Sequence, residues 1–281
     1  MKDRIFAIGW PFSPAYSSNS TRRPKHFRWT KDPSEATIPI TVCIDGGIRK
    51  GLKQPGRKIA WILESPAISA WQKVSLFIKQ NLDEVLEAYE VVLTSDRDFC
   101  RLDPKIQYHT AGSNLPWIAE EQYGLHEKTK LCSMFASNKQ MVEGHRIRHT
   151  YAERLKDKLD LFGGACGSKR LGNGKPHPHK AGGLIPYMFS VTMENCRVPL
   201  YYTEKITDCF ATGTVPVYWG PREIGEIFDS DGILFLDEDF DPGMLSEDLY
   251  RSMLPAVRQN LEIVSDLEGS DDELYRKYIR A

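Results

Sequence analysis

The stretch from Met188 to Pro221 constrains the fold more than any other part of this chain. Met188 to Met193 is a short apolar run rich in β-formers, which is typical of a buried strand. A polar loop follows, and an apolar helical pattern begins after Thr203, a residue type that caps helix N-termini. Gly213 stands where a left-handed helix end is expected, before a second β-rich run, Thr214–Trp219. This order of elements indicates an open α/β sheet.

Polar side chains gather in the loop and the first helical turn of this stretch. Ligands of open α/β sheets lie beyond the carboxyl ends of the strands and face helix N-termini, whose free N–H groups suit a phosphate. Each side chain alone has a structural explanation, such as Glu204 complementing the helix dipole. Their concentration in one strand–loop–helix favours a binding site. The residues are Glu194, Asn195, Tyr201, Tyr202, Thr203, Glu204 and Lys205.

The order of these residues resembles the signature motif of the α1,3/4-fucosyltransferases, glycosyltransferase family 10. The motif elements are Glu194-Asn195, the run from Tyr201 to Lys205, and the run from Gly213 to Pro221. The resemblance implies an α/β fold of GT-B type, with two Rossmann-like domains facing each other across a cleft. It implies an N-terminal acceptor-binding domain at 1–128 and a C-terminal sugar-nucleotide-binding domain, with C-terminal helices, at 129–281.

A second informative place is the apolar run Ile59–Leu63, a predicted buried strand with Glu64 at its carboxyl end. Strand ends are where catalytic groups are usually placed. The residues alone leave two readings of Glu64 open, a catalytic base or a carboxylate that pairs with a cation or caps the next helix. In the family, a strand that ends in glutamate and is followed by Ser-Pro occupies this position. The resemblance therefore implies that Glu64 is the general base.

A third element combines the predicted strand Lys130–Asn138 with arginines and a helix that carries Tyr151, Leu155 and Leu159 on one face. In the family, such a strand followed by an arginine before a helix begins the donor domain. A guanidinium suits this position because its planar fork binds pyrophosphate oxygens bidentately. Arg148 is the better match to the family's phosphate-binding arginine, and Arg146 is the reserve candidate.

These resemblances imply an inverting glycosyltransferase that moves fucose from GDP-fucose to a hydroxyl of an oligosaccharide or glycan, as an α1,3-fucosyltransferase. Arg148 and Lys205, with the helix start at Thr203, would hold the pyrophosphate. Asn195, Tyr201 and Glu204 would contact the ribose or the donor sugar. Two alternatives stay open: the same fold with another nucleotide-hexose donor, and a non-catalytic carbohydrate- or nucleotide-binding module.

Composition limits the other classes of function. The chain has 281 residues, 41% hydrophobic and 27% charged, which is ordinary for a globular protein, and its net charge of −1 gives no reason to expect nucleic-acid binding. The six cysteines are scattered without a C-x-x-C pair, which argues against a zinc site. The N-terminal apolar run is too short for a signal peptide or an anchor. We expect a cytoplasmic enzyme of bacterial or viral type, with peripheral membrane association left open.

Metal sites are weakly indicated. Asp96-x-Asp98 and Asp237–Asp239 follow predicted strands, as metal-binding carboxylates do in some glycosyltransferases, but both are more typical of strand-terminal turns. His177 and His179 lack a third ligand, and Gly174-Lys175 lacks the glycine and hydroxyl spacing of a P-loop. We therefore expect no required cofactor or metal, with a divalent cation stimulatory at most.

Elsewhere the pattern predicts a long loop from Pro11 to Pro33 and a helix from Ser69 to Gln80. It also predicts a helix at Ser246–Asn260, which Pro255 would end or kink, and a last helix at Glu273–Ile279.

Overall fold

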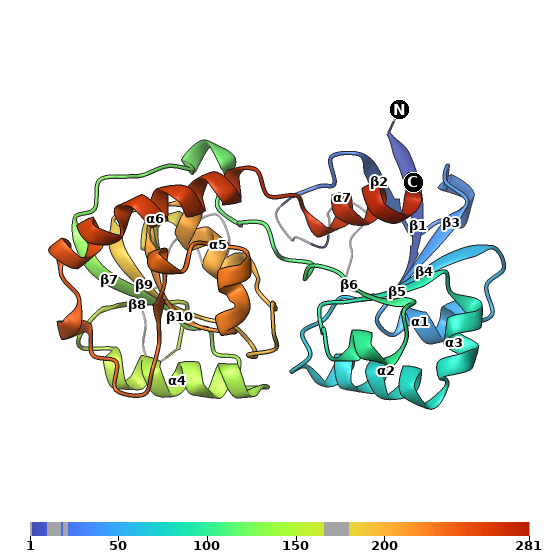
Figure 1. Cartoon of the computed structure of the whole chain (residues 1–281), viewed down its shortest axis with the longest axis horizontal. Coiled ribbons are helices and arrows are strands. Elements are labelled where there is room, and N and C mark those ends of the chain that lie inside the picture. Colours follow the sequence, from blue (N-terminus) through green and yellow to red (C-terminus); the bar gives the residue numbers. More distant parts are fainter. Residues whose placement is uncertain (1, 10–17, 19–21, 166–179, 281) are drawn as a thin grey trace. The chain divides into compact units, whose positions relative to one another are not determined.

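The computed structural model describes residues 2–9, 18, 22–165 and 180–280. The chain forms two compact units (Figure 1). The first comprises Met1–Asn114 together with Glu268–Ala281, and the second is Leu115–Leu267. The assignment of an acceptor domain to 1–128 and a donor domain to 129–281 stays a prediction, because compactness alone does not say which unit binds which substrate.

The first unit contains a parallel sheet with the strand order β2-β1-β3-β4-β5-β6. Its strands are β1 (Asp3–Ile8), β2 (Phe27–Thr30), β3 (Ile40–Ile44), β4 (Arg57–Ile62), β5 (Val91–Thr94) and β6 (Ile106–Tyr108). Its helices are α1 (Gly47–Gly51), α2 (Ser69–Gln80), α3 (Leu82–Ala88) and α7 (Ser270–Leu274), which continues as a π-helical turn at Tyr275–Ile279. Short 3-10 turns lie at Pro33–Glu35 and Phe99–Leu102.

Both faces of this sheet are buried. In β4, Ile59 and Trp61 join the cluster that includes Leu274 and Tyr275 from the C-terminal segment. Ala60 and Ile62, which alternate with them, join the cluster formed with α1, α2 and α3. A parallel strand that is buried on both faces has a continuous apolar sequence, which explains why β4 could be predicted.

The second unit contains a parallel sheet with the strand order β11-β10-β9-β7-β8. Its strands are β7 (Lys130–Phe135), β8 (Asp160–Phe162), β9 (Tyr187–Met193), β10 (Val215–Trp219) and β11 (Leu234–Phe235). Its α-helices are α4 (Glu143–Leu155), α5 (Glu204–Ala211) and α6 (Glu247–Ser265). Short 3-10 turns lie at Glu120–Gln122, Lys180–Gly183, Arg222–Glu226, Ser230–Gly232 and Pro242–Met244.

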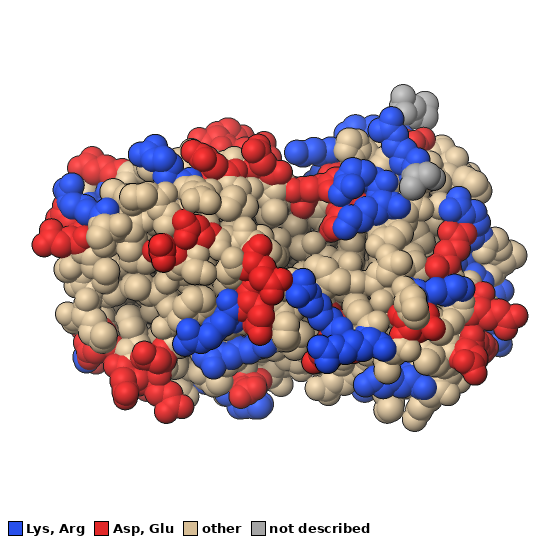
Figure 2. Space-filling view, in the orientation of Figure 1, with Lys and Arg blue, Asp and Glu red and all other residues tan. Residues whose placement is uncertain are grey.

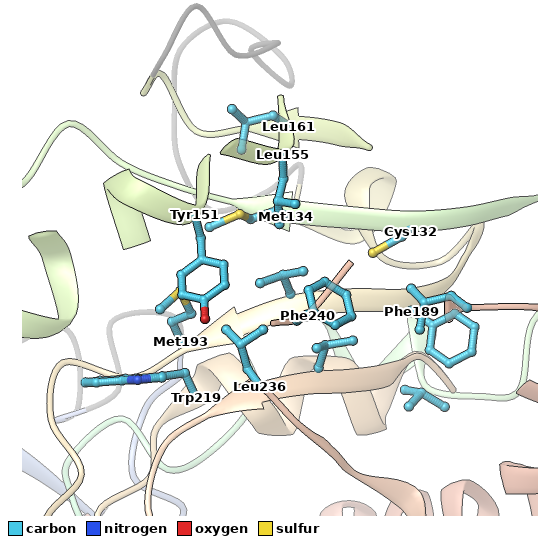
Figure 3. Close-up of a cluster of buried hydrophobic side chains, with 14 of the residues drawn as sticks. Cys132, Met134, Tyr151, Leu155, Leu161, Phe189, Met193, Trp219, Leu236 and Phe240 are labelled. Carbon is cyan, nitrogen blue, oxygen red and sulfur yellow. The ribbon is translucent and has the colours of Figure 1, made fainter. Parts of the chain in front are cut away.

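One core cluster of the second unit lies between the sheet and helices α4 and α6. Figure 3 shows its side chains gathered from several elements, with Tyr151 of α4 beside Met193 of β9 and Trp219 of β10. Val257 of α6 is fully buried in the same cluster. This packing fixes the carboxyl ends of β9 and β10 relative to α4.

The structure corrects three predictions about elements. The predicted loop Pro11–Pro33 contains strand β2 at Phe27–Thr30, which pairs in parallel with β1. Helix α6 neither ends nor breaks at Pro255 but runs on to Ser265, because buried residues on both sides of the proline hold it against the core. Arg146 and Arg148 lie inside α4 rather than before it.

Charged residues of both signs lie on the face of the molecule seen in Figure 2. Figure 2 shows Lys and Arg side chains interspersed with Asp and Glu side chains on each unit, in agreement with the net charge of −1. Among the described helices, none combines the length and the apolar character needed to span a bilayer.

Candidate functional site

The candidate site is built where β9 passes into α5. Glu194 directly follows β9 and is fully buried, and its carboxylate accepts hydrogen bonds from the Thr203 main-chain N–H (3.0 Å) and the Thr203 hydroxyl (2.8 Å). Thr203 has extended backbone angles and is the residue before α5, as predicted, but its side chain makes no capping bond to the helix. The Glu194 carboxylate therefore ties the end of β9 to the start of α5.

Lys205 lies in the first turn of α5 and contacts the same groups. Its ammonium donates to the Thr203 hydroxyl at 2.8 Å and lies 3.4 Å from a Glu194 carboxylate oxygen. It also lies 3.6 Å from Glu204 Oε1, and about a fifth of its side chain is exposed (21%). A cation held on two carboxylates yet open to solvent can bind an incoming anion.

Glu204 is buried between two ammonium groups. Lys180 Nζ lies 3.8 Å from Glu204 Oε1 and also bonds Asp208, one helical turn further along α5. Burial alone would raise the pKa of Glu204, but Lys205 and Lys180 outweigh it and lower that pKa. Glu204 is therefore ionised and held in place at neutral pH.

Lys180 and Asp208 are members of this cluster that the sequence did not indicate. Asp208 is fully buried and accepts hydrogen bonds from the main-chain N–H groups of Trp117 (2.7 Å) and Ile118 (3.1 Å). Lys180 also lies over the Trp117 ring, 5.0 Å from its centroid. Burial would lower the pKa of Lys180, but Asp208 and Glu204 outweigh it and raise that pKa. The sequence signal was the i, i+4 spacing of two acids, Glu204 and Asp208, on one short helix.

Arg148 of α4 reaches the end of β9 from the other direction. It is 6% exposed, and its Nη2 donates to the main-chain oxygens of Met193 (2.5 Å) and Glu194 (3.5 Å). Burial lowers its pKa, while Glu194, Glu204 and Tyr201 oppose that shift, which places all three acidic groups within electrostatic range. Within the described residues, Nε and Nη1 of Arg148 donate to no acceptor.

The structure separates the two arginine candidates. Arg146 is exposed on α4, whereas Arg148 is buried beside the Glu194 carbonyl. Two positions apart on a helix, the side chains cannot face the same way. Of the two, Arg148 is the one that joins the cluster with Lys205.

His145 of α4 lies near several of these positive charges. It is 4% exposed, and burial, followed by the charges of Arg148, Lys139 and Lys205, lowers its pKa to about 4. Its Nδ1 and the Asn195 Oδ1 are both enclosed and make no well-formed hydrogen bond among the described residues, although Asn195 interacts with the His145 ring and opposes the fall of its pKa. Unpaired polar atoms beside several cations fit a site that completes its hydrogen bonds with an anionic or polar ligand.

Two tyrosines lie next to the charged cluster. Tyr201, a predicted ligand contact, is 4% exposed and follows Leu200, whose φ of 59° is unusual for a bulky residue. Tyr218 is buried, its hydroxyl has no hydrogen-bond partner within the described part of the chain, and burial raises its pKa well above the usual value, with Glu194 and Tyr201 adding to the shift. Backbone strain and an orphaned hydroxyl beside the cluster are features of functional sites.

Two glycines permit the close packing. A Cβ on Gly144, in the first turn of α4, would lie 2.4 Å from the Glu194 carbonyl oxygen and 2.7 Å from that of Asn195. A Cβ on Gly220, at the end of the motif, would lie 2.2 Å from Tyr218 Cζ. The absence of a side chain at each position lets α4 and the Tyr218 ring reach the site.

The cluster as a whole is electrically balanced. Its cations are Arg148, Lys180 and Lys205, and its carboxylates are Glu194, Glu204 and Asp208. The cations are thus held by protein carboxylates rather than by solvent alone. Because Arg148 keeps unused donors and Lys205 is partly exposed, a doubly negative group would find two cations already in position.

Glu64 belongs to the first unit and is half-buried just beyond β4. Its main-chain N–H donates to Oδ1 of Asp45 at 3.3 Å, and the N–H of Leu63 donates to the same atom at 2.9 Å. The predicted placement of a carboxylate at a strand end is therefore present. The other predicted ligand contacts, Arg148, Asn195, Tyr201, Glu204 and Lys205, all lie in the second unit.

The acidic pairs considered as metal ligands form turns. Oδ1 of Asp96 accepts the main-chain N–H groups of Asp98 (2.9 Å) and Phe99 (3.3 Å). In the described part of the chain, no group of three or more His, Cys, Asp or Glu side chains is arranged to hold a metal ion. Gly174-Lys175, His177 and His179 lie outside the described residues.

The chain is similar to known proteins both in sequence and in fold. The family model "Glycosyltransferase family 10 (fucosyltransferase) C-term" matches residues 125–238. A curated relative, the alpha-(1,3)-fucosyltransferase FucT of Helicobacter pylori, is 29% identical over 83 residues, which is 30% of this chain and 17% of that protein. The match therefore spans less than a fifth of the relative's length.

Solved structures of an α1,3-fucosyltransferase have the same fold. The crystal structure with GDP-fucose has a TM-score of 0.52 at 14% identity and covers 96% of this chain and 84% of that chain. The one with GDP has a TM-score of 0.50 at 16% identity and covers 96% and 82%. This likeness confirms the predicted α/β fold of GT-B type. Residues 125–238, which include the strand–loop–helix that carries Glu204 and Lys205, are similar to the C-terminal domain of glycosyltransferase family 10 (fucosyltransferase).

Proposed function

We propose that this chain is a fucosyltransferase that moves fucose from GDP-fucose to a hydroxyl of a carbohydrate acceptor and forms an α1,3 linkage. One observation carries the proposal: the family match at 125–238 contains Arg148, Asn195, Tyr201, Glu204 and Lys205, which the second unit brings into one region. The donor identity is supported by the α1,3-fucosyltransferase structures with GDP and GDP-fucose.

The proposed donor site offers positive charge to the diphosphate that leaves during the reaction. When the bond between the anomeric carbon and the phosphate oxygen breaks, its electron pair leaves with GDP and negative charge grows on the diphosphate. Lys205 and Arg148 offer two cations for that charge, each already held by hydrogen bonds. Asn195, Tyr201 and Glu204 would contact the ribose or the sugar, where an ionised Glu204 can accept hydrogen bonds from hydroxyls.

Glu64 is the proposed general base. It would take the proton of the acceptor hydroxyl while that oxygen forms a bond to the anomeric carbon on the face opposite the departing GDP. A single displacement of this kind inverts the configuration of the anomeric carbon. The atoms of the step balance: one C–O bond forms, one C–O bond breaks, and the proton stays on Glu64 until solvent removes it.

Protein cations, not a metal ion, are proposed to neutralise the leaving group. The charges of Arg148 and Lys205, which add to the larger effect of burial in lowering the pKa of His145, support this role. Full transfer activity in excess chelator is the expected result, and an absolute requirement for a divalent cation would overturn this part of the proposal.

A panel of sugar nucleotides tests the function directly. The purified chain is incubated with GDP-fucose, other GDP-hexoses and UDP-hexoses, each with and without oligosaccharide acceptors, and products are identified by mass spectrometry and linkage analysis. Preferred use of GDP-fucose with an α1,3-linked product supports the proposal. Preferred use of another donor would reassign the substrate, and tight GDP binding without transfer would favour a non-catalytic binding module.

A further inference from the structure

A buried acid supports the main chain of the proposed base. Asp45 directly follows β3 and is 6% exposed, although it is an ionisable residue. Its φ of 46° puts the backbone in the left-handed region, which costs free energy for a residue other than glycine and is tolerated best by Asn and Asp. Burial and backbone strain at one position mark a residue that the surrounding structure holds for a reason.

The contacts of Asp45 converge on the end of β4. Its main-chain N–H donates to the Trp61 carbonyl at 2.9 Å. Its side-chain Oδ1 accepts the N–H groups of Leu63 at 2.9 Å and Glu64 at 3.3 Å. The strand has ended by then, since β4 stops at Ile62. Asp45 therefore replaces the strand partner that these two N–H groups no longer have.

The local charges argue against a purely stabilising role. The charged side chain that acts on the Asp45 carboxyl among the described residues is Glu64, another acid, and no cation compensates it. Burial, reinforced by Glu64 and opposed by the two N–H groups, raises the pKa of Asp45 to about 7. Selection for stability alone would not favour a buried acid beside a second acid at this position. What Asp45 provides is an oxygen atom that accepts hydrogen bonds from the main chain just after β4.

We propose that Asp45 is a positioning residue for Glu64, which fixes the main chain of Leu63 and Glu64 so that the Glu64 carboxylate stands ready to accept a proton. This inference rests on the proposed role of Glu64 as the general base. Asp45 itself contacts no substrate and acts through Glu64 alone. The essential feature is the acceptor oxygen at Oδ1, not the charge.

Two variants separate the acceptor from the charge. Asp45→Asn keeps an acceptor oxygen and tolerates the left-handed backbone, whereas Asp45→Gly removes the oxygen and fits the same φ without strain. Asp103→Ala is the matched control, since Asp103 Oδ1 accepts a main-chain N–H (Lys105, 2.8 Å) in the same unit, away from Glu64. Each variant is measured for amide hydrogen exchange at Leu63 and Glu64 and for kcat and KM with GDP-fucose and acceptor.

Asp45→Gly is expected to speed exchange at the two amides about tenfold, the equivalent of one net hydrogen bond. It is expected to lower kcat by about a hundredfold, the effect of a misplaced catalytic group, with the donor KM unchanged. Asp45→Asn is expected to restore most of both properties, and Asp103→Ala to change neither.

Faster exchange in Asp45→Gly with an unchanged kcat would overturn the inference, as would an Asp45→Asn variant as inactive as Asp45→Gly. Failure of the proposed function looks different. If wild type transfers no sugar, or Glu64→Ala retains transfer, there is no base to position and the catalytic part of the inference falls with it, whatever the exchange rates show.

Discussion

The Glu194 carboxylate accepts hydrogen bonds from both the main-chain N–H and the hydroxyl of Thr203, so a protein carboxylate already occupies the start of α5. The sequence suggested that this helix start would bind a phosphate directly. With Glu194 in that position, a diphosphate would have to be held by the side chains around it. Lys205, which contacts both residues of the pair, is the nearest of these cations.

The first prediction concerns the two cations. Arg148→Ala and Lys205→Ala are each expected to weaken GDP binding by about 1.5–3 kcal/mol, the contribution of a charge-assisted hydrogen bond, or about 10- to 150-fold in Kd. Arg146→Ala, on the exposed side of the same helix, is expected to bind GDP normally. Calorimetric titration of the folded variants measures all three. A larger loss for Arg146→Ala than for Arg148→Ala would reverse the assignment.

The second prediction concerns Glu64. Glu64→Gln is expected to lower kcat by about 10²- to 10⁴-fold, because the amide cannot accept the acceptor proton. Affinity for GDP should stay the same, since the proposed donor contacts lie in the second unit. Single-turnover transfer assays and GDP titrations on the same preparation check both statements. Turnover near the wild-type rate would remove Glu64 as the base.

The third prediction concerns Lys180, which neutralises two buried carboxylates. Lys180→Met is expected to cost roughly 3–5 kcal/mol of unfolding free energy at neutral pH, because Glu204 and Asp208 lose a buried partner. The loss should shrink in acid, where the carboxylates can be neutralised by protons. Urea unfolding at several pH values measures it.

The double variant Lys180→Met with Asp208→Asn provides the comparison for that experiment, since it removes the unpaired charge together with the cation. It should be more stable than Lys180→Met alone. Lys156→Met, which breaks an exposed pair with Glu153, should leave stability unchanged. Equal effects of Lys180→Met at neutral and acid pH would contradict the role assigned to the buried carboxylates.

The fourth prediction concerns the pH dependence of stability at Asp45. Its pKa is about 7 in the folded chain, against an ordinary aspartate value of 3.8. Between these values the unfolded chain ionises while the folded one holds its proton, so stability falls as pH rises through this window. Asp45→Asn lacks this loss and should become the more stable protein toward pH 8 or so, by up to about 4 kcal/mol. Melting temperatures of both proteins across the window test the sign.

The fifth prediction concerns Gly220. Gly220→Ala places a methyl group 2.2 Å from Cζ of the buried Tyr218 ring, which must then move. We expect a loss of about 1–3 kcal/mol in unfolding free energy, the usual cost of overpacking. Gly46→Ala, whose Cβ has nothing within 4 Å, should cost nothing. Denaturant unfolding distinguishes the two, and equal stability of both variants would argue against close packing at Tyr218.

Local patterns predicted much of the fold. Helix α2 runs from Ser69 to Gln80, as its pattern predicted, and β4, β9 and β10 were visible as apolar runs because they are buried on both faces. Gly213 has a φ of 66°, in keeping with its predicted place after α5. Signals of this kind act within a few residues and can be read without the tertiary structure.

Long-range pairing explains what was missed. Strand β2 is four residues long and is defined by its partner β1, which the local pattern of Phe27–Thr30 does not reveal. Lys180 bonds Asp208, which lies 28 residues later in the sequence. Asp45 accepts a hydrogen bond from Leu63, which lies 18 residues later. The inward direction of Glu194 likewise depends on how the loop to Thr203 folds back. None of these relationships has a period that can be detected in the sequence.

The first unit is completed by the last residues of the chain. Asp271 accepts hydrogen bonds from the Ser18 N–H and the Trp29 indole, and Leu274 is buried in the same core as Ile5. The second unit is in topological terms an insertion into the first. A growing chain on the ribosome therefore has to hold the N-terminal sheet without the cover from 268–280 until the whole second unit has been synthesised. Contacts of such long sequence separation form slowly, so the uncovered face of that sheet is exposed to aggregation during biosynthesis.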